Sequence, residues 1–495
     1  MIILQTKLTS PPLKDESNPI SLSCGEGARR AGEVWRCLGR LLFFTILFLL
    51  SACNEKTPWK PDPGEEEPTP PVVTPGENPF KAPLYWSVYE YCFTVDGGIP
   101  EFEWEKNIDW VEKNLLPYGY DMICIDGWGD VVTDPVTGYR TNHSFEWKND
   151  YAWWSKELRK RGMRLGIYDN PLWINGNRDI IVEGTNVRLR DLVDPDAGDL
   201  WFSWLNVDRK GAKEYIEGFF KHYAKMDVDY IRIDFLSWYE NGYDRGIGTV
   251  GKGYGRENYE LALKYIYESA SKYNIFISLV MPHNYEDAVL ESQYGHMMRI
   301  NADCLTGGWW RFSDVERGEY FENWPQYSNP FDGFIHWSRL SGREKIILDG
   351  DFIRLNTFES DYEKESCVSL NLMAGGPVTV SDQYNTIGNN LKFYTNDEML
   401  QLNKDGFVGK PLSHDPKNND SQIWYGQMSN GDWIVGLFNR ENTPQVRSIL
   451  FSRLGIDGTM QVRDLWKHTD LGEKNQLMVT LEPHACLIVK LTKSE

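Results

Sequence analysis

Short apolar runs alternate with helical patterns from Pro83 to about residue 395. The runs are rich in β-branched and aromatic residues, which is typical of strands, and the stretches between them carry the spacing of amphipathic helices. Eight such runs occur, at residues 84–88, 121–126, 163–169, 229–235, 275–280, 297–302, 345–351 and 377–382. The helical patterns cover residues 103–116, 151–161, 212–225, 257–273 and 362–374. Eight strands interleaved with helices predict a (β/α)8 TIM barrel.

An open, doubly wound sheet would produce the same alternation of strands and helices. We prefer the barrel because no glycine-rich nucleotide loop follows the first strand. After about Leu400 the pattern changes to short alternating strands with turn signals, such as Ser-Asn-Gly-Asp at residues 429–432. The fold class is therefore predicted as α/β, with a barrel at residues 83–395 and a C-terminal antiparallel β-sandwich at residues 396–495.

The N-terminal region carries a targeting signal. Residues 40–52 read RLLFFTILFLLSA, a basic flank and an apolar run that is short for a membrane span, and Cys53 follows. We interpret residues 1–53 as a leader with a signal peptide. The ending LSAC resembles the bacterial lipobox, which implies cleavage before Cys53 and lipidation of its thiol. A retained membrane helix is the weaker alternative, because charged and Pro-rich sequence starts at Asn54.

Residues 54–82 form a segment rich in proline and acidic residues without hydrophobic periodicity, which predicts a linker. Together with the lipobox, this predicts a protein anchored by lipid in the bacterial cell envelope, periplasmic or on the outer-membrane surface. Membrane contact is expected through the anchor alone.

The overall charge argues against a nucleic-acid partner. The 495 residues contain 52 Lys plus Arg against 72 Asp plus Glu, a formal charge of -20, whereas phosphate binding needs basic surfaces. The 20 Trp and 26 Tyr fit stacking on sugar faces, and equally the core of a large domain. A neutral partner is therefore expected.

Cysteine and histidine spacing does not indicate a metal site or a disulfide framework. Three of the eight cysteines, Cys24, Cys37 and Cys53, fall in the leader, and the remaining five are scattered. A bridge between Cys92 and Cys124 stays open, with buried free thiols favoured. None of the eight histidines has close ligand spacing, so no metal or other cofactor is predicted.

Two acids occupy corresponding places in the pattern of strands. Asp234 ends the run VDYIRIDF, and Asp303 follows MMRINA. The carboxyl ends of barrel strands meet at one face, so the two acids are expected to face one cleft, as paired carboxylates do in glycosidases. The alternative is that each Asp simply caps the next helix.

Other polar and aromatic residues also end predicted strands and would line the same face. They are Trp86, Asp126, Trp128, Asp169, Arg232, Arg299, Asp349 and Asp351. Carboxylates accept hydrogen bonds from sugar hydroxyls, and indole rings stack on C–H faces, so this set indicates a sugar-binding pocket. Calcium or magnesium binding by the same acids is the alternative, which the lack of a compact DxDxD motif disfavours.

Four segments, in order, resemble the signatures of clan D retaining glycosidases, especially family 27 α-galactosidases. The segments are YGYDMICIDGWGD, RGMRLGIYDNP, VDYIRIDF and the R-x-x-x-D of Arg299 to Asp303. The resemblance spans residues 83–495 and implies a barrel with a C-terminal β-domain. It implies Asp234 as nucleophile and Asp303 as acid/base, with sugar contacts at Asp126 and Trp86. No cofactor is implied.

The sequence departs from the family pattern around the sugar pocket. Arg232 replaces a lysine, Gly127 replaces the second of two paired acids, and Phe235 and Leu236 stand where a cysteine is usual. An insertion at residues 170–208 contains three tryptophans, which would form aromatic subsites or pack a surface loop. The tryptophans of the insertion are Trp173, Trp201 and Trp204. Because the departures lie around the sugar pocket, the identity of the sugar that binds there stays open.

The sequence thus predicts a retaining exo-α-glycosidase that hydrolyses terminal α-linked sugars, α-galactosides first, in oligo- or polysaccharides. One alternative is an α-glucan (dextran-type) hydrolase of the same clan. The other is a non-catalytic glycan-binding lipoprotein, which would need neither Asp234 nor Asp303.

Overall fold

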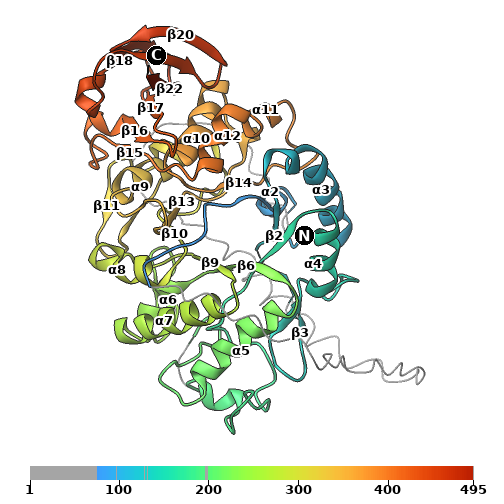
Figure 1. Ribbon diagram of the computed structural model, residues 1–495. Helices are drawn as coiled ribbons and strands as arrows, with labels where there is room; N and C mark the ends of the chain where they lie inside the picture. Colours follow the sequence, from blue (N-terminus) through green and yellow to red (C-terminus); the bar gives the residue numbers. More distant parts are fainter. Residues whose placement is uncertain (1–74, 96, 128, 131, 196–198, 494–495) are drawn as a thin grey trace, which may run out of the picture.

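The computed structural model describes residues 75–95, 97–127, 129–130, 132–195 and 199–493 (Figure 1). The predicted leader, its Cys53 and most of the predicted linker lie outside these residues, as does Trp128. Within the described ranges, none of the helices is both long and apolar enough to cross a membrane.

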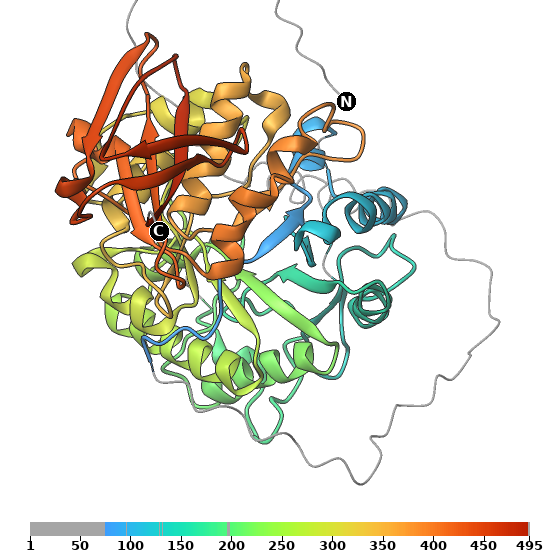
Figure 2. The same cartoon turned by 45° about the horizontal axis from the view of Figure 1, so that its top comes forward.

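Eight parallel strands form one sheet in the order β13-β10-β9-β6-β5-β2-β1-β14. Each of the eight predicted runs overlaps one of these strands. They are β1 (Leu84–Ser87), β2 (Met122–Ile125), β5 (Arg164–Tyr168), β6 (Val228–Ile233), β9 (Phe276–Leu279), β10 (Met297–Arg299), β13 (Ile347–Asp349) and β14 (Val378–Val380). The chain after β13 joins the other edge of the sheet, because Ile353 bridges Val380 in parallel fashion. The sheet therefore curls into a barrel (Figure 2).

Helices surround this sheet. The predicted helical stretches correspond to α3 (Glu101–Asn114), α4 (Tyr151–Lys160), α5 (Ala212–Ala224), α7 (Arg256–Lys272) and α10 (Asp361–Met373). Shorter helices complete the layer: α2 (Tyr89–Thr94), α6 (Leu236–Asn241), α8 (Tyr285–Tyr294), α9 (Pro330–Trp337), α11 (Leu391–Tyr394) and α12 (Asp397–Asp405). Their apolar faces pack on the outside of the strands in one large core.

The interior of the barrel is a separate small cluster. It contains Tyr85, Met122, Cys124, Tyr230, Phe276, Met297 and Ile347. Since side chains alternate along a strand, the neighbours of these residues point outward to the helices. This alternation decides which strand-end residues can reach the functional face.

Three small antiparallel hairpins extend from the barrel. They are β3 (Val132–Thr133) with β4 (Arg140–Asn142), β7 (Tyr243–Asp244) with β8 (Gly248–Thr249), and β11 (Tyr320–Phe321) with β12 (Gln326–Tyr327). The last hairpin borders the predicted site, because Asn301 bridges Tyr327. The sequence patterns did not predict these hairpins.

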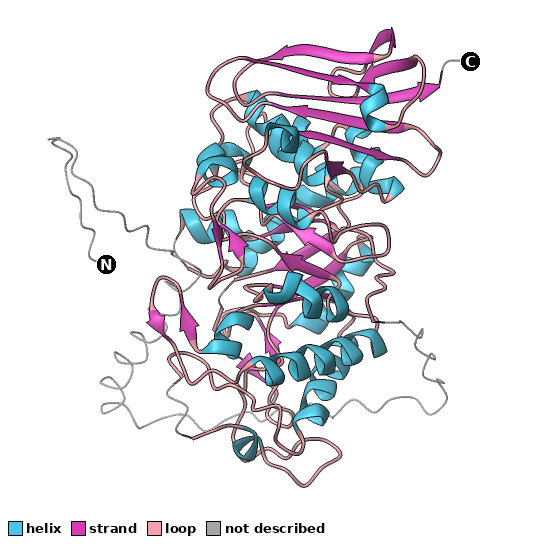
Figure 3. Cartoon of the chain, turned by 90° about the vertical axis from the view of Figure 1, so that its left-hand side faces the viewer, coloured by secondary structure: helices cyan, strands magenta, loops and turns pink. Residues whose placement is uncertain are grey.

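A C-terminal β-domain packs on the barrel (Figures 1 and 3). One antiparallel sheet has the order β15-β16-β17-β22-β19-β20, and β18 pairs with β21. Their bounds are β15 (Lys410–Pro411), β16 (Ile423–Gln427), β17 (Trp433–Phe438), β18 (Gln445–Leu450), β19 (Met460–Asp464), β20 (Thr469–Lys474), β21 (Gln476–Leu481) and β22 (Cys486–Lys493). The predicted fold class, a TIM barrel followed by a β-sandwich, is confirmed.

The contact between the two parts is partly ionic. Arg440 of the β-domain lies 2.6 Å from Asp332 of α9, and neither side chain is exposed. The ring of His484 stacks on Trp309 at a centroid distance of 4.5 Å. Separating the two domains would leave the buried charges of Arg440 and Asp332 without partners. These contacts therefore hold the β-domain in a defined position on the barrel.

Candidate active site

Asp234 lies directly after β6, at the carboxyl end of the barrel, and is buried. Its Oδ2 accepts a hydrogen bond from the Tyr168 hydroxyl at 2.9 Å, and its Oδ1 accepts one from the Phe235 N–H at 2.6 Å. Phe235 has a left-handed backbone (φ 63°), which is unusual for a bulky residue. Such strain is a feature of functional sites, and here it turns the Phe235 N–H toward the carboxylate.

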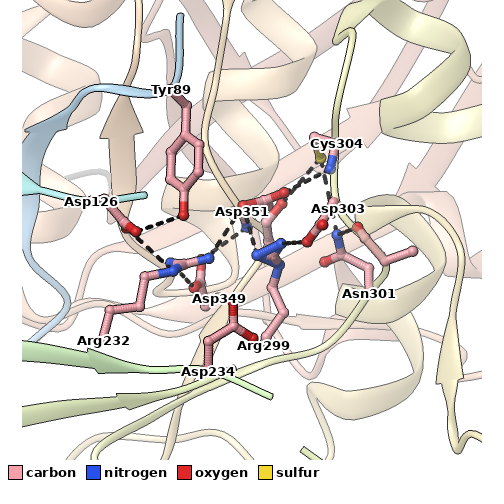
Figure 4. A network of polar contacts seen from close by, with 12 residues as sticks. Tyr89, Asp126, Arg232, Asp234, Arg299, Asn301, Asp303, Cys304, Asp349 and Asp351 are labelled. Carbon is pink, nitrogen blue, oxygen red and sulfur yellow. Dashed lines mark hydrogen bonds and ion pairs between the residues drawn. The ribbon is translucent and has the colours of Figure 1, made fainter. Parts of the chain in front are cut away.

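Burial raises the pKa of Asp234 to about 6, with a further increase from the nearby charge of Asp303. Arg232 and the two hydrogen bonds act in the opposite direction. Asp303 is therefore close enough for its charge to act on Asp234. Figure 4 shows both in one cluster of polar residues.

Asp303 follows β10 and is more accessible than Asp234, with 21% of its side chain exposed. Arg299, at the end of β10, donates from Nη2 to Asp303 Oδ1 at 2.6 Å. The same guanidinium places Nη1 2.7 Å from Asp351 Oδ1. Arg299 thus joins the predicted acid/base to a buried acid that follows β13.

Arg232 occupies the centre of the cluster, with its side chain 2% exposed. Its guanidinium contacts three fully buried acids, one that follows β2 and two from β13 and the turn after it. The contacts are Nε to Asp126 Oδ2 at 3.3 Å, Nη1 to Asp349 Oδ2 at 3.2 Å and Nη2 to Asp351 Oδ1 at 3.5 Å. Arg232 therefore offsets part of the negative charge that these buried acids carry.

Asp126 follows β2 and is held by two donors. The Tyr89 hydroxyl donates to its Oδ1 at 2.7 Å, and the Gly127 N–H donates to the same oxygen at 2.8 Å. Burial raises the pKa of Asp126, and Arg232 opposes that effect. The structure thus brings together Asp126, Arg232, Arg299, Asp234 and Asp303 at one end of the barrel, as expected.

The expectation for Trp86 is corrected. Trp86 is fully buried, its ring lies 5.9 Å from that of Trp104 on α3, and its Nε1 donates to the Asp382 carbonyl at 2.9 Å. Its neighbour Tyr85 points into the barrel, so Trp86 must point to the helices. It belongs to the core and does not face the acid pair.

Asp169 is corrected for the same reason. Its predecessor Tyr168 points inward to Asp234, and Asp169 points outward to α5. The Tyr223 hydroxyl donates to Asp169 at 2.5 Å, and Arg140 Nε lies 3.5 Å from it. Asp169 anchors a helix and a hairpin to the barrel, and it lies outside the cluster around Asp234.

The insertion at residues 170–208 contains both buried and partly exposed aromatic rings. Trp173 and Trp204 are buried and pack a loop. Phe202 is half-buried, stacks on Trp173 at 4.3 Å and lies 5.1 Å from Phe235, the residue after Asp234. Trp201 is half-buried against Trp238. The partly exposed aromatic surface near the acids therefore comes from Trp201 and Phe202.

Tyr89 and Tyr168 are site residues that the sequence reasoning missed. Tyr168 immediately precedes Asp169, and alternation with the buried strand would have identified it as the inward residue. Tyr89 lies in α2 after β1 and stacks on Phe352 at 4.2 Å. The search for polar residues at strand ends could not find Tyr89, because Tyr89 lies in a short helix.

In the part of the chain that the structure describes, no group of three or more His, Cys, Asp or Glu is arranged to hold a metal ion. The described cysteines Cys92, Cys124, Cys304, Cys367 and Cys486 are free thiols. The chemistry that the cluster offers is that of two carboxyl groups in different settings. One is buried and hydrogen-bonded, and the other is partly exposed beside a guanidinium. Two carboxyl groups that face one pocket are what glycoside hydrolysis uses.

Comparison with known proteins matches both parts of the chain. Residues 418–491 match the α-galactosidase C-terminal β-sandwich domain. The chain is 43% identical over 431 residues to an isomalto-dextranase of Arthrobacter globiformis, covering 83% of this chain and 67% of that protein. It is 25% identical over 389 residues to an α-galactosidase of Oryza sativa subsp. japonica, covering 77% and 78%.

Solved structures agree with these relationships. The isomalto-dextranase of Arthrobacter globiformis T6 complexed with panose superposes with a TM-score of 0.79 and 41% identity, over 87% of this chain and 76% of that one. A GH27 β-L-arabinopyranosidase from Geobacillus stearothermophilus superposes with a TM-score of 0.64 and 20% identity, over 84% and 97%. The second likeness concerns the fold alone.

Proposed function

Because the chain belongs to glycoside hydrolase family 27 of clan D, and is thus an α-glycosidase of that family, we propose that it hydrolyses α-glucans of the dextran type. The observation that carries this proposal is the 43% identity to an isomalto-dextranase, against 25% to an α-galactosidase. The α-glucan alternative from the sequence is therefore better supported than the α-galactoside expectation.

The pocket supports an α-glucan substrate. Glucose and galactose differ in the orientation of one hydroxyl, so discrimination depends on polar groups around that hydroxyl. The second acid of the α-galactosidase pattern is replaced by Gly127, whose backbone is left-handed (φ 85°) and whose N–H is used to orient Asp126. Arg232, in place of the family lysine, is occupied by three acids. The sugar pocket thus lacks two features of the galactoside pattern.

The proposed mechanism is a double displacement. Asp234, held by Tyr168 and the Phe235 N–H, attacks the anomeric carbon while Asp303 donates its proton to the leaving oxygen. Water then hydrolyses the glycosyl-enzyme, with Asp303 as general base. The C–O bond to Asp234 breaks, and the sugar leaves with its original α configuration.

A substrate panel tests the proposal. The purified protein should release reducing sugar from dextran and isomaltose at a kcat/KM at least tenfold above that for melibiose and raffinose. Proton NMR of the first products should show the α anomer before mutarotation. Faster hydrolysis of the galactosides would reject the α-glucan assignment, and a β anomer as first product would reject the double displacement.

We further propose that Cys53 carries a lipid anchor in the bacterial envelope, from the LSAC ending of the apolar run and the Pro- and acid-rich segment after it. The end of the predicted linker that the structure describes lies near the amino-terminal ends of the barrel strands, on the side opposite the candidate site. Gly76 N–H donates to the Gln293 carbonyl, and Phe80 packs against Phe276 in the interior cluster.

A further inference from the structure

Asp351 contacts two groups next to Asp303, the Arg299 guanidinium and the Cys304 peptide. It follows β13 and its side chain is not exposed, so it cannot reach a leaving group. Its Oδ1 lies 2.7 Å from Arg299 Nη1, and Arg299 Nη2 donates to Asp303 at 2.6 Å. One guanidinium is therefore shared between a buried acid and the partly exposed acid of the reaction (Figure 4).

The second contact concerns the backbone. The Cys304 N–H donates to Asp351 Oδ2 at 2.6 Å, and Cys304 immediately follows Asp303. Asp351 thus uses one oxygen to hold the guanidinium beside the Asp303 carboxyl group and the other to hold the adjacent peptide. Both bonds are charge-assisted and short, so they restrict the position of Asp303 from two sides.

Asp351 holds this position with a strained backbone conformation. Its φ is 80°, a left-handed conformation that non-glycine residues rarely adopt. The Asp351 N–H donates to Asp349 Oδ1 at 2.8 Å, which holds the turn. Preceding Gly350 cannot be enlarged, because an added Cβ would meet the Phe334 ring at 2.5 Å. Strain retained in a fully determined turn indicates a functional constraint.

We propose that Asp351 is a positioning residue for the acid/base, acting on Asp303 through Arg299 and the Cys304 peptide. This proposal rests on the assignment of Asp303 in the proposed function. Asp351 touches neither the substrate nor the leaving group. Its role is to fix the geometry of proton donation and to keep a negative charge on the far side of Arg299.

The charged and titratable groups that face Asp351 come from three strands. Arg299 and Asp303 belong to β10 and its extension, Arg232 to β6 and Asp349 to β13, and the Cys304 thiol lies beside them. Burial raises the pKa of Asp351 to about 7, Arg299 opposes that effect, and Asp303 adds to it. Asp351 and Asp303 share the Arg299 guanidinium, so removing the charge of Asp351 changes the electrostatic surroundings of Asp303.

The substitution Asp351→Asn tests the proposal, because the amide oxygen can still accept from the Cys304 N–H while the charge beside Arg299 is lost. Arg299 then attracts Asp303 more strongly and favours its charged form. We expect the basic limb of the kcat/KM profile to move to lower pH by about one unit. Hydrolysis of the natural glycan should fall at least tenfold more than hydrolysis of an aryl glycoside with an activated leaving group, which needs little proton donation.

The matched control is Asp382→Asn. Asp382 is also buried after a barrel strand, and it accepts from the Tyr394 hydroxyl and from the Leu355 and Asn356 N–H groups, outside the cluster. It should change neither the basic limb nor the dependence on the leaving group. Should Asp351→Asn fail to fold, Arg299→Lys decides, because an ammonium group keeps the charge at Asp303 but cannot bridge to Asp351, and the same dependence on the leaving group is expected.

Equal losses on both kinds of substrate with unchanged pH limbs, in a folded Asp351→Asn or Arg299→Lys protein, would overturn the proposal. The test uses whichever aryl α-glycoside the native protein hydrolyses. If that substrate is a galactoside, the α-glucan assignment fails while the test of Asp351 remains valid. If Asp303→Ala shows no dependence on the leaving group, the assignment of Asp303 fails, and the proposal for Asp351 fails with it.

Discussion

Replacing Asp234 by Asn should stabilise the folded protein at neutral pH while abolishing catalysis. Asp234 is buried, and its pKa in the folded protein is about 6 against an ordinary value of 3.8. A raised folded-state pKa means that folding favours the protonated form. The associated stability is fully present below about pH 3.8 and is lost as the pH rises through about 6.

The magnitude follows from the two pKa values. The difference between 3.8 and about 6 corresponds to about 3 kcal/mol at pH 7 and above. Asparagine is never charged, so the substitution removes this cost, although Asn keeps only one oxygen acceptor for the Phe235 N–H and the Tyr168 hydroxyl. For a chain of this length the melting entropy is on the order of 0.9 kcal/mol/K, so the gain in Tm should be at most about 3 °C.

Thermal unfolding followed by calorimetry between pH 4 and 8 measures this effect. The Tm difference between Asp234→Asn and the native protein should be smallest at pH 4 and should grow through pH 6. Asp457→Asn, at an exposed position, provides a control for the loss of one aspartate charge. A Tm difference that is constant with pH, or that favours the native protein increasingly above pH 6, would refute the reasoning about burial of Asp234.

Three further predictions concern single residues. Tyr168→Phe removes a hydrogen-bond donor to Asp234, so the carboxylate loses stabilisation worth about 1.5 kcal/mol. The substitution should lower kcat about tenfold and move the acid limb of the kcat/KM profile to higher pH. An unchanged acid limb in steady-state kinetics would contradict the role of this hydrogen bond. Asp303→Ala should hydrolyse natural glycans very slowly yet keep faster glycosylation with activated aryl glycosides, and equal loss on both would identify Asp303 as a binding residue. Cys53→Ala should release the protein from membranes or leave an uncleaved precursor in cell fractionation, and undiminished lipid labelling would exclude this anchor.

The barrel could be predicted because its strands are short apolar runs; seven lie within the predicted ranges, and β6 begins one residue before its range. The small hairpins could not, since strands of two or three residues carry no detectable period. The helix ends differ from prediction by only one or two residues, for example at α3 and α10.

The sequence indicated which positions along the chain belong to the site better than it indicated which way their side chains point. Asp234, Arg232 and Asp126 lie on inward positions, and they meet as expected. Trp86 and Asp169 end strands on outward positions, next to the inward Tyr85 and Tyr168. A one-residue step along a strand reverses the side, so a rule that selects strand ends without fixing the alternation mixes site residues with core residues. Contacts across the barrel, such as that of Asp351 with Cys304, depend on the closed fold.

Trapping of the covalent intermediate tests the central claim most directly. The protein should be incubated with a fluorinated α-glucosyl or α-isomaltosyl fluoride, digested, and mapped by mass spectrometry, with the α-galactosyl counterpart in parallel. The account predicts a glycosyl adduct on the peptide that contains Asp234, formed faster from the glucosyl than from the galactosyl reagent. An adduct on another carboxylate, or one formed only from the galactosyl reagent, would contradict it.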